Sequence, residues 1–278
     1  MTEYRLGVIG DPIDHSLSPQ IHNLFAEQTN LKIDYQPYRV LSENLNSFVR
    51  DFFESGGDGL NVTLPHKVQC SQIATSTSPI VDLIGAANTL KSAKRSKDIF
   101  AESTDGNGLI QDLQEKSKIS SANILILGAG GSALSIIPSI AGCLPKKILL
   151  DNRSQEKIQP LIERFNNLTI NNSMIDNINH FEDDIDIVIN ATSAGFSGAF
   201  NWYRDLNLSK KTFFYDLSYT KDNSKTPFLN WAIQYSNNYS DGFGMLINQA
   251  ALSYELWTGI MPNTTIKKVA TKLCKAFL

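Results

Sequence analysis

A strand, a glycine-rich turn and a helix follow one another directly in the middle of the chain. Residues Asn123 to Leu127 form a near-continuous apolar run, which is typical of a strand buried on both faces of a sheet. Gly128, Gly130 and Ala133 follow with the spacing G-x-G-x-x-A, and a helical pattern then extends to about Gly142. Glycines at these positions permit a tight turn and let backbone N–H groups, including those near Gly131 and Ser132, approach a pyrophosphate at the helix N-terminus. The pattern predicts a Rossmann-type dinucleotide-binding domain.

A polar cluster about 20 residues further on bears on the choice of dinucleotide. Asp151 ends the next predicted strand and is followed by Asn152, Arg153 and Ser154, with Lys157 three positions later. An acidic side chain here accepts a hydrogen bond from the ribose 2′-OH of NAD, whereas Arg and a second cation bind the 2′-phosphate of NADP. Arg153, Ser154 and Lys157 favour NADP, and Asp151 leaves NAD use open.

The N-terminal part of the chain alternates between strand and helix patterns. Strands are expected at residues 5–10, 34–40 and 59–63, with one helix capped by Ser18 and another capped by Ser42. Such a β-α-β-α-β series predicts a second α/β domain with an open, mainly parallel sheet. Further strands are expected at 87–90, 98–101, 148–150, 185–190 and 213–217, and further helices after 108 and at 155–165, 245–258 and 264–277. Residues 70–79 receive no assignment.

Lys67 and Asp105 each follow a predicted strand. Lys67 comes just after Pro65, which ends the strand that contains Asn61, and Asp105 follows the short run from Ile99 to Ala101. Ligands of open α/β sheets bind outside the carboxyl ends of the strands, where a Lys–Asp pair can exchange a proton with an oxygen atom. From spacing alone a surface ion pair is the commoner explanation.

Composition excludes several classes of function. The chain has 278 residues, of which 42% are hydrophobic, and a net charge of -3, which provides no electrostatic basis for binding nucleic acid or membrane surfaces. The three cysteines are far apart and the four histidines lack metal-ligand spacing, so neither disulfides nor a metal site is expected. No secretory signal or membrane-spanning run is found, and we expect a cytoplasmic protein, monomer or homodimer, that acts on a small molecule.

The order of eight short motifs resembles that of the shikimate dehydrogenase family across nearly the whole chain. The S-x-S-P and lysine motifs are specific to that family, whereas the glycine turn is not. The motifs are Ser16-Leu17-Ser18-Pro19, Asn61-Val62-Thr63-Leu64-Pro65-His66-Lys67, Ala87-Asn88-Thr89, Thr104-Asp105-Gly106, Gly128-Ala129-Gly130-Gly131, Asn152-Arg153-Ser154, Asn190-Ala191-Thr192-Ser193 and Asp241-Gly242-Phe243-Gly244-Met245-Leu246.

The resemblance implies reduction of 3-dehydroshikimate to shikimate by NADPH, in aromatic amino-acid and chorismate biosynthesis. It implies that Lys67 and Asp105 are the catalytic pair, and leaves open which is the formal acid. It implies substrate contacts for Ser16, Ser18, Thr63, Asn88, Tyr219 and Gln249, and NADP contacts for Gly128, Gly130, Gly131, Ser132, Asn152, Arg153, Ser154, Lys157, Thr192, Leu217 and Gly242. It further implies a substrate-binding domain of residues 1–105 plus 245–278, a cofactor domain of residues 106–244, and an active site in the cleft between them.

Two departures from the family pattern keep alternatives open. Leu134 stands where a basic residue is common, and Lys157 stands where Arg is common, so the phosphate contacts differ in detail. The alternatives are a quinate/shikimate dehydrogenase that uses NAD, a non-catalytic ligand sensor on the same fold, and another two-domain NADP dehydrogenase such as the folate type. Intact Lys67 and Asp105 disfavour the sensor, and the folate type does not account for Ser16-Leu17-Ser18-Pro19.

Overall fold

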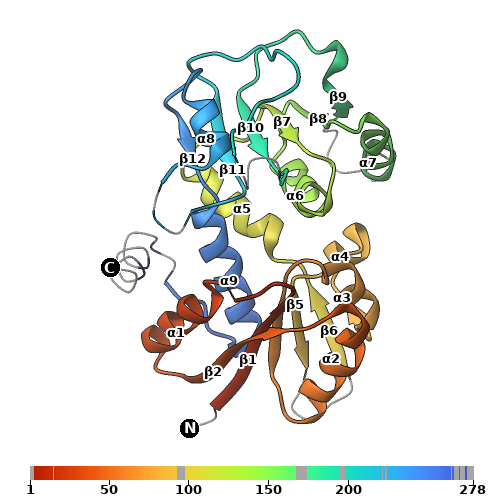
Figure 1. Ribbon diagram of the computed structural model, residues 1–278, viewed down its shortest axis with the longest axis vertical. Helices are drawn as coiled ribbons and strands as arrows, with labels where there is room; N and C mark the ends of the chain where they lie inside the picture. Colours follow the sequence, from red (N-terminus) through yellow and green to blue (C-terminus); the bar gives the residue numbers. More distant parts are fainter. Residues whose placement is uncertain are drawn as a thin grey trace. The chain divides into compact units, whose positions relative to one another are not determined.

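The structure, a computed structural model, describes residues 3–14, 16–92, 98–166, 174–193, 198–220, 222, 224–263, 265, 269 and 273. The chain divides into two compact units, each with its own sheet (Figure 1). Unit 1 contains residues Met1–Gly108 and Ile247–Leu278, and unit 2 contains Leu109–Leu246. The predicted last helix, 264–277, lies almost entirely outside the described residues.

Unit 1 is built on a six-stranded sheet in the order β2-β1-β3-β5-β6-β4. Its strands are β1 (Glu3–Gly10), β2 (Lys32–Arg39), β3 (Gly59–Val62), β4 (Ser76–Thr77), β5 (Thr89–Ser92) and β6 (Ile99–Glu102). The parallel pairings of β1 with β2 and β3 confirm the predicted β-α-β-α-β series. β5 is antiparallel to both neighbours. For its pairing with β6 the reason is the connection between the two strands, which is too short for a parallel crossover.

The helices of unit 1 cover both faces of this sheet. They are α1 (Ser18–Thr29), α2 (Leu45–Glu54, after a 3-10 turn at Ser42–Asn44), α3 (Lys67–Ile73) and α4 (Pro79–Ile84). Residues 70–79, unassigned from sequence, complete α3, form β4 and begin α4. The predicted caps were wrong: Leu17 and Leu41 occupy the N-cap positions before Ser18 and Ser42, and neither makes a side-chain cap hydrogen bond.

Successive residues of β1 face opposite sides of the sheet, as the period of a strand requires. Leu6 and Val8 pack in one apolar cluster with Trp257, which lies on the C-terminal helix α9 (Phe243–Thr258). Ile9 packs on the other side in a cluster with Leu45, among other residues of α2. The C-terminal helix is therefore part of the core of unit 1.

Unit 2 is an all-parallel sheet in the order β12-β11-β10-β7-β8-β9. Numbered from β7, this is the order 3-2-1-4-5-6 of a Rossmann dinucleotide-binding domain, as predicted. The strands are β7 (Asn123–Leu127), β8 (Lys147–Asp151), β9 (Met174–Asn177), β10 (Ile187–Asn190), β11 (Phe213–Asp216) and β12 (Tyr239–Ser240). The helices are α5 (Asp105–Gln114), which begins in unit 1, α6 (Gly131–Gly142), α7 (Ile158–Asn166) and α8 (Pro227–Ala232), with 3-10 turns at Gln155–Lys157 and Ile178–His180.

All five residues of β7 are buried, in agreement with a central strand covered on both faces.

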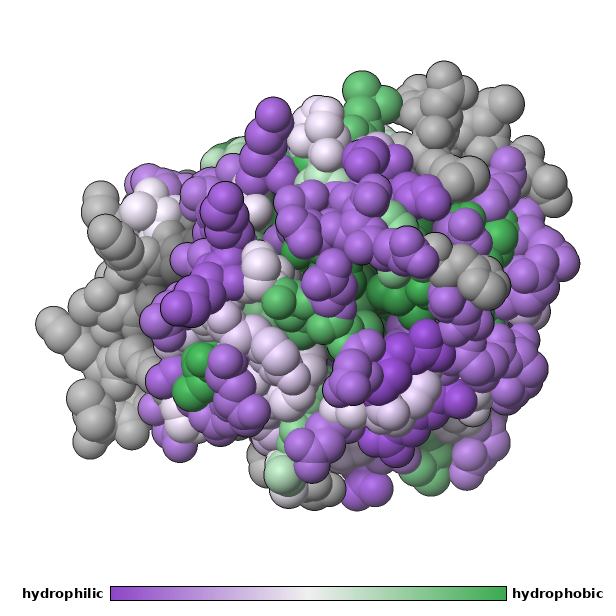
Figure 2. All heavy atoms as spheres, turned by 90° about the horizontal axis from the view of Figure 1, so that it is seen from above, coloured by the Kyte–Doolittle hydropathy of each residue, from purple (hydrophilic) through white to green (hydrophobic). Residues whose placement is uncertain are grey.

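On the side of the molecule shown in Figure 2, hydrophilic side chains predominate and hydrophobic ones show in smaller areas between them. Within the described ranges, none of the helices has the length and apolar character needed to cross a membrane.

The contact between Gly59 and Trp257 provides a test of how α9 packs on the sheet. A Cβ atom at Gly59 would lie 2.2 Å from Trp257 Nε1, and this indole is held by a 2.9 Å hydrogen bond from Nε1 to Leu90 O. Gly59→Ala is therefore expected to lower the free energy of unfolding by about 1–3 kcal/mol, the usual cost of overpacking. Gly142→Ala is the matched control, because a Cβ there meets nothing within 4 Å. Denaturant unfolding followed by circular dichroism measures both, and equal stability of the two variants would contradict this packing.

Candidate active site and dinucleotide-binding loop

The structure brings Lys67 and Asp105 together. β3 ends at Val62, and α3 begins with Lys67, whereas Asp105 is the first residue of α5, just after β6. Lys67 Nζ donates to Asp105 Oδ2 at 2.6 Å, and the side chains are 29% and 9% exposed, respectively. An ammonium group donates up to three hydrogen bonds, so a half-exposed Lys67 can serve Asp105 and a ligand oxygen together.

Asn88 joins this pair to two further elements. Its Nδ2 donates to Asp105 Oδ1 at 2.9 Å, to Thr104 Oγ1 at 2.9 Å and to Gln249 Oε1 on α9 at 3.2 Å. Asn88 is only 3% exposed, so these partners replace water around its amide. Four residues predicted from separate parts of the sequence thus form one cluster: Lys67, Asn88, Asp105 and Gln249.

The residues that hold this cluster in place were not predicted from the sequence. Asn88 Oδ1 accepts from Thr89 Oγ1 at 3.0 Å, and Thr89 Oγ1 lies 2.7 Å from Ser253 Oγ, one helical turn after Gln249. His66, beside Lys67, donates from Nε2 to Val40 O at 2.7 Å. Their places in the sequence could have indicated them, since each of these residues lies next to, or one helical turn from, a predicted site residue.

Ser16, Ser18 and Thr63 lie at other points of unit 1, the two serines at the start of α1 and Thr63 directly after β3. Ser16 Oγ accepts from the backbone N–H of Ser18 at 3.2 Å, which helps to hold the start of α1. Ser18 is buried, and Thr63 is half-buried directly after β3. Burial raises the pKa of Tyr35, and a side-chain hydrogen bond with Ser18 opposes this rise.

The glycine turn after β7 has the geometry expected for close approach of a ligand. Gly128 has φ +113°, and a Cβ there would lie 3.0 Å from both Ala191 O and Thr192 Cγ2, so only glycine fits at this position. Gly130 and Gly131 differ, because a Cβ at either would meet nothing within 4 Å. The N-terminus of α6, where Ser132 is exposed, is thus open to a pyrophosphate.

The loop after β8 presents the predicted phosphate-binding side chains. Arg153 and Lys157 are exposed, whereas Asn152 and Ser154 are half-buried. Asn152 Nδ2 donates to Ser154 O at 2.9 Å and so shapes the loop. Two cations and a hydroxyl in an exposed loop fit a 2′-phosphate.

Asp151, which the sequence left open as a ribose acceptor, is fully buried. Its Oδ2 accepts from Trp202 Nε1 at 2.7 Å and lies 3.3 Å from Arg204 Nε. Its Oδ1 accepts from the Tyr203 hydroxyl and from Gln155 Nε2, the latter at 3.2 Å. Donors of the protein itself therefore surround this carboxylate.

The predicted nicotinamide-side residues lie after β10 and β11. Thr192 Oγ1 donates to Asn190 Oδ1 at 2.7 Å. A Cβ at Gly242 would lie 2.2 Å from Leu217 O, so these two residues are in direct contact. Tyr219 packs edge-to-face on Phe243, with ring centroids 6.1 Å apart, and burial raises the pKa of its hydroxyl.

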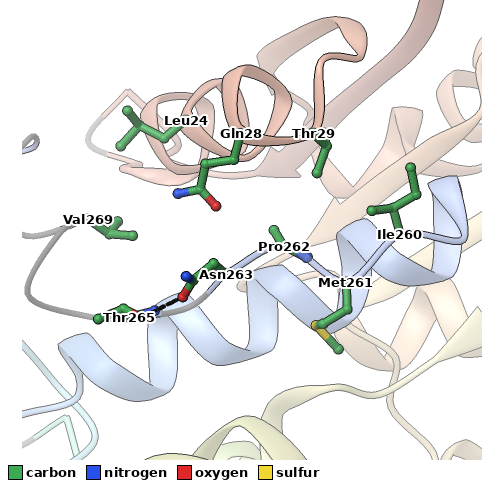
Figure 3. Close-up of a pocket in the computed structure, with 9 residues that line it drawn as sticks. All are labelled: Leu24, Gln28, Thr29, Ile260, Met261, Pro262, Asn263, Thr265 and Val269. Carbon is green, nitrogen blue, oxygen red and sulfur yellow. Dashed lines mark hydrogen bonds between the residues drawn. The ribbon is translucent and has the colours of Figure 1, made fainter.

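A separate pocket of about 530 Å³ lies in unit 1 between α1 and the segment that follows α9 (Figure 3). None of its lining residues is among the predicted site residues. They are Leu24, Gln28, Thr29, Ile260, Met261, Pro262, Asn263, Thr265 and Val269.

Comparison with known proteins matches three family descriptions to successive parts of the chain. The shikimate dehydrogenase substrate binding domain matches residues 8–90, and the shikimate / quinate 5-dehydrogenase description matches residues 111–219. The shikimate 5′-dehydrogenase C-terminal domain matches residues 242–266. These matches contain most of the predicted site residues.

Full-length relatives agree with these matches. The NADP(+) shikimate dehydrogenase of Colwellia psychrerythraea is 38% identical over 98% of this chain and 96% of its own length. A crystal structure of shikimate dehydrogenase in complex with NADP+ is 28% identical, with a TM-score of 0.85, and covers 98% of this chain and 96% of that one. Shikimate 5-dehydrogenase from Listeria monocytogenes, solved with shikimate and NAD, is 26% identical, with a TM-score of 0.84 and the same coverage.

This similarity over nearly the full length agrees with three features of the structure. They are the glycine turn, the order of strands in unit 2 and the ion pair of Lys67 with Asp105. This chain belongs to the shikimate dehydrogenase family.

Proposed function

We propose that this protein catalyses the reversible reduction of 3-dehydroshikimate to shikimate with NADPH. The observation that carries the proposal is the cluster of Lys67, Asp105, Asn88 and Gln249. Hydrogen bonds link its ammonium to its carboxylate, the carboxylate to the first amide and the first amide to the second. The relatives named as NADP(+) shikimate dehydrogenases support both the reaction and the cofactor.

Lys67 is the residue that meets the reacting oxygen in this proposal. During reduction of a ketone, negative charge develops on the carbonyl oxygen. The Lys67 ammonium stabilises that charge and supplies a proton. Asp105 holds the ammonium at 2.6 Å, and Asn88 in turn fixes the other oxygen of the Asp105 carboxylate at 2.9 Å.

The remaining substrate contacts are assigned by chemistry. A substrate with one carboxylate and several ring hydroxyls needs hydroxyl donors for the former and mixed donors and acceptors for the latter. We assign Ser16 and Ser18 to the carboxylate, and Thr63, Asn88 and Gln249 to the ring hydroxyls, with Tyr219 nearby. The exposed side of Lys67, at 29%, supports access of a ligand to this cluster.

The residues of unit 2 fit NADP. NADPH supplies the hydride when bound. Gly128, Gly130, Gly131 and Ser132 would hold the pyrophosphate on the open N-terminus of α6. The loop of Asn152, Arg153, Ser154 and Lys157 would hold the 2′-phosphate, and Thr192, Leu217 and Gly242 would contact the nicotinamide side. Unit 1 is thereby assigned to substrate and unit 2 to cofactor.

The cysteines bear on the cellular setting. We assign a cytoplasmic location, which the free thiols of Cys70 and Cys143 support, since unpaired cysteines suit a reducing compartment. A monomer or homodimer is expected, and sedimentation velocity measures this directly.

The experiment that tests the function is absorbance at the nicotinamide band. Shikimate and quinate are each offered with NADP and with NAD, and shikimate with NADP is expected to give the highest kcat/KM. A preference for quinate with NAD would instead establish the NAD-dependent alternative. Ligand binding without turnover in all four mixtures would establish the sensor.

Lys67→Met keeps the bulk of the stem and removes the charge. It is expected to lower kcat by roughly 10²-fold or more, the range for a lost acid–base group, with a much smaller change in KM. Asp105→Asn is also expected to lower kcat, and the double variant to be little worse than the worse single one, because the two residues act as a unit. Single-turnover hydride transfer measures the chemical step.

Lys116→Met is the matched control for Lys67→Met. Lys116 is also 29% exposed and also pairs with a buried carboxylate, that of Asp112. It lies outside the proposed site, so near-normal turnover is expected. A chemical step within about threefold of wild type in Lys67→Met would remove the pair from the mechanism.

Ser16→Ala and Ser18→Ala are expected to raise the KM for shikimate with little change in kcat. The reason is that the substrate carboxylate keeps its charge throughout the reaction, so its contacts do not strengthen in the transition state. Ser47→Ala, at an exposed serine of α2, is the control. A fall in kcat alone in either variant would refute the positioning role, and a loss of stability without kinetic change would leave only a structural one.

Arg153→Ala is expected to weaken the binding of NADP by on the order of tenfold or more and the binding of NAD far less. The reason is that charge-assisted hydrogen bonds to a phosphate are among the strongest hydrogen bonds. Arg164→Ala, at an exposed arginine in the last turn of α7, is the control and should change neither. Steady-state kinetics with both cofactors measures the ratio. Equal losses for NADP and NAD would rule out a specific phosphate contact.

A further inference from the structure

Three consecutive residues far from β8 in the sequence enclose the carboxylate that ends this strand. Trp202 donates to Asp151 Oδ2 at 2.7 Å, and Arg204 Nε lies 3.3 Å from the same oxygen. The Tyr203 hydroxyl donates to Asp151 Oδ1 and also lies 3.2 Å from Asn152 O. We call Trp202, Tyr203 and Arg204 the Asp151 clamp.

The clamp is fixed in place by packing. Phe200, two residues earlier, is 4% exposed in the apolar core of unit 2, and its ring stacks on that of Trp202 at 5.9 Å. The Arg204 guanidinium lies 5.0 Å from the Tyr203 ring centroid and donates to Asn179 Oδ1 at 2.8 Å. A segment held in this way presents its donors to Asp151 without further ordering.

The protonation state of the clamp suits its role as a donor. Partial desolvation of its hydroxyl and the adjoining Asp151 carboxylate raise the pKa of Tyr203 to about 12. The hydroxyl therefore keeps its proton at neutral pH. A guanidinium is always charged in proteins, so Arg204 neutralises Asp151 at every working pH.

The position of Asp151 links the clamp to recognition of the ribose 2′ position. An acidic side chain at the end of the second strand of a Rossmann unit accepts from the ribose 2′-OH of NAD, and its charge opposes a 2′-phosphate. β8 is that second strand, and Asp151 directly precedes Asn152, Arg153 and Ser154. In this chain the carboxylate is 0% exposed, and its two oxygens already have three hydrogen-bond donors and one ion-pair partner.

We propose that Trp202, Tyr203 and Arg204 determine cofactor specificity by taking up the Asp151 carboxylate, so that the ribose end of NAD loses its acceptor and the 2′-phosphate of NADP meets no uncompensated negative charge. The inference rests on the proposed use of NADP and adds three positioning residues, which act through Asp151. It also accounts for an acidic residue directly beside a phosphate-binding loop.

The test compares two nucleotide fragments that need neither substrate nor turnover. Binding of 2′,5′-ADP and of 5′-AMP is measured by calorimetry for wild type and for Tyr203→Phe/Arg204→Met, which keeps the ring and much of the stem. The variant is expected to bind 2′,5′-ADP about tenfold or more weakly and to bind 5′-AMP equally or better. The ratio of kcat/KM for NADP and NAD should fall in parallel.

Adding Asp151→Asn to the double variant is expected to restore most of the affinity for 2′,5′-ADP, because the exposed charge is gone. Tyr235→Phe/Arg164→Met, which removes the same groups elsewhere in unit 2, is the control and should leave the ratio unchanged. Thermal unfolding of each protein verifies folding. If the double variant does not fold, the isosteric Tyr203→Phe alone is expected to shift the ratio in the same direction.

An unchanged ratio in the folded variants, or an equal loss for both fragments, overturns the inference. So does loss of 5′-AMP binding in Asp151→Asn alone, since that would make Asp151 a ribose ligand. Wild type that shows no preference for 2′,5′-ADP would contradict the NADP part of the proposed function itself. If wild type prefers 2′,5′-ADP but the clamp variants bind both fragments as wild type does, only the inference about the clamp is contradicted.

Discussion

The side-chain amide of Asn88 is buried beside the start of α5 and the middle of α9, and each of its polar atoms has a partner there. Its Nδ2 donates to Asp105 and Thr104 at the start of α5 and to Gln249 on α9, and its Oδ1 accepts from the Thr104 backbone N–H at 2.9 Å. A buried amide left without partners costs about 1–3 kcal/mol per group. The start of α5 and the middle of α9 are therefore held against the sheet of unit 1 at the point where Asp105 meets Lys67.

A second buried amide supports the first. Asn61 Nδ2 donates to Ser253 Oγ at 3.0 Å, and its Oδ1 accepts from the Tyr35 hydroxyl at 2.8 Å and lies 3.1 Å from His22 Nε2. Burial lowers the pKa of His22 to about 3, so this histidine is neutral at working pH. The network is thus uncharged up to the Lys67–Asp105 pair, where the charges of the site are concentrated.

Much of this arrangement followed from local pattern. The central strand β7, its glycine turn and α6 were predicted because apolar runs and turn glycines act over a few residues. The helix caps predicted at Ser18 and Ser42 were wrong by a single position. The backbone hydrogen bonds set where a helix begins, and here a leucine without a side-chain cap hydrogen bond occupies each cap position. The short strand β12 and the short helix α8 were not predicted, because each has too few residues to show a periodic pattern of apolar side chains.

The sequence by itself determined the two α/β units, the glycine turn and the presence of a lysine and an aspartate at strand ends, because each depends on neighbouring residues. Only the tertiary structure decided which side chains those residues meet. Asn88 reaches Gln249 across 161 positions, and Asp151 is enclosed by Trp202 from 51 positions away. No local pattern reports such partners, because packing brings them together only when the sheets have formed, and burial then decides whether a carboxylate is free for a ligand or is already satisfied by the protein.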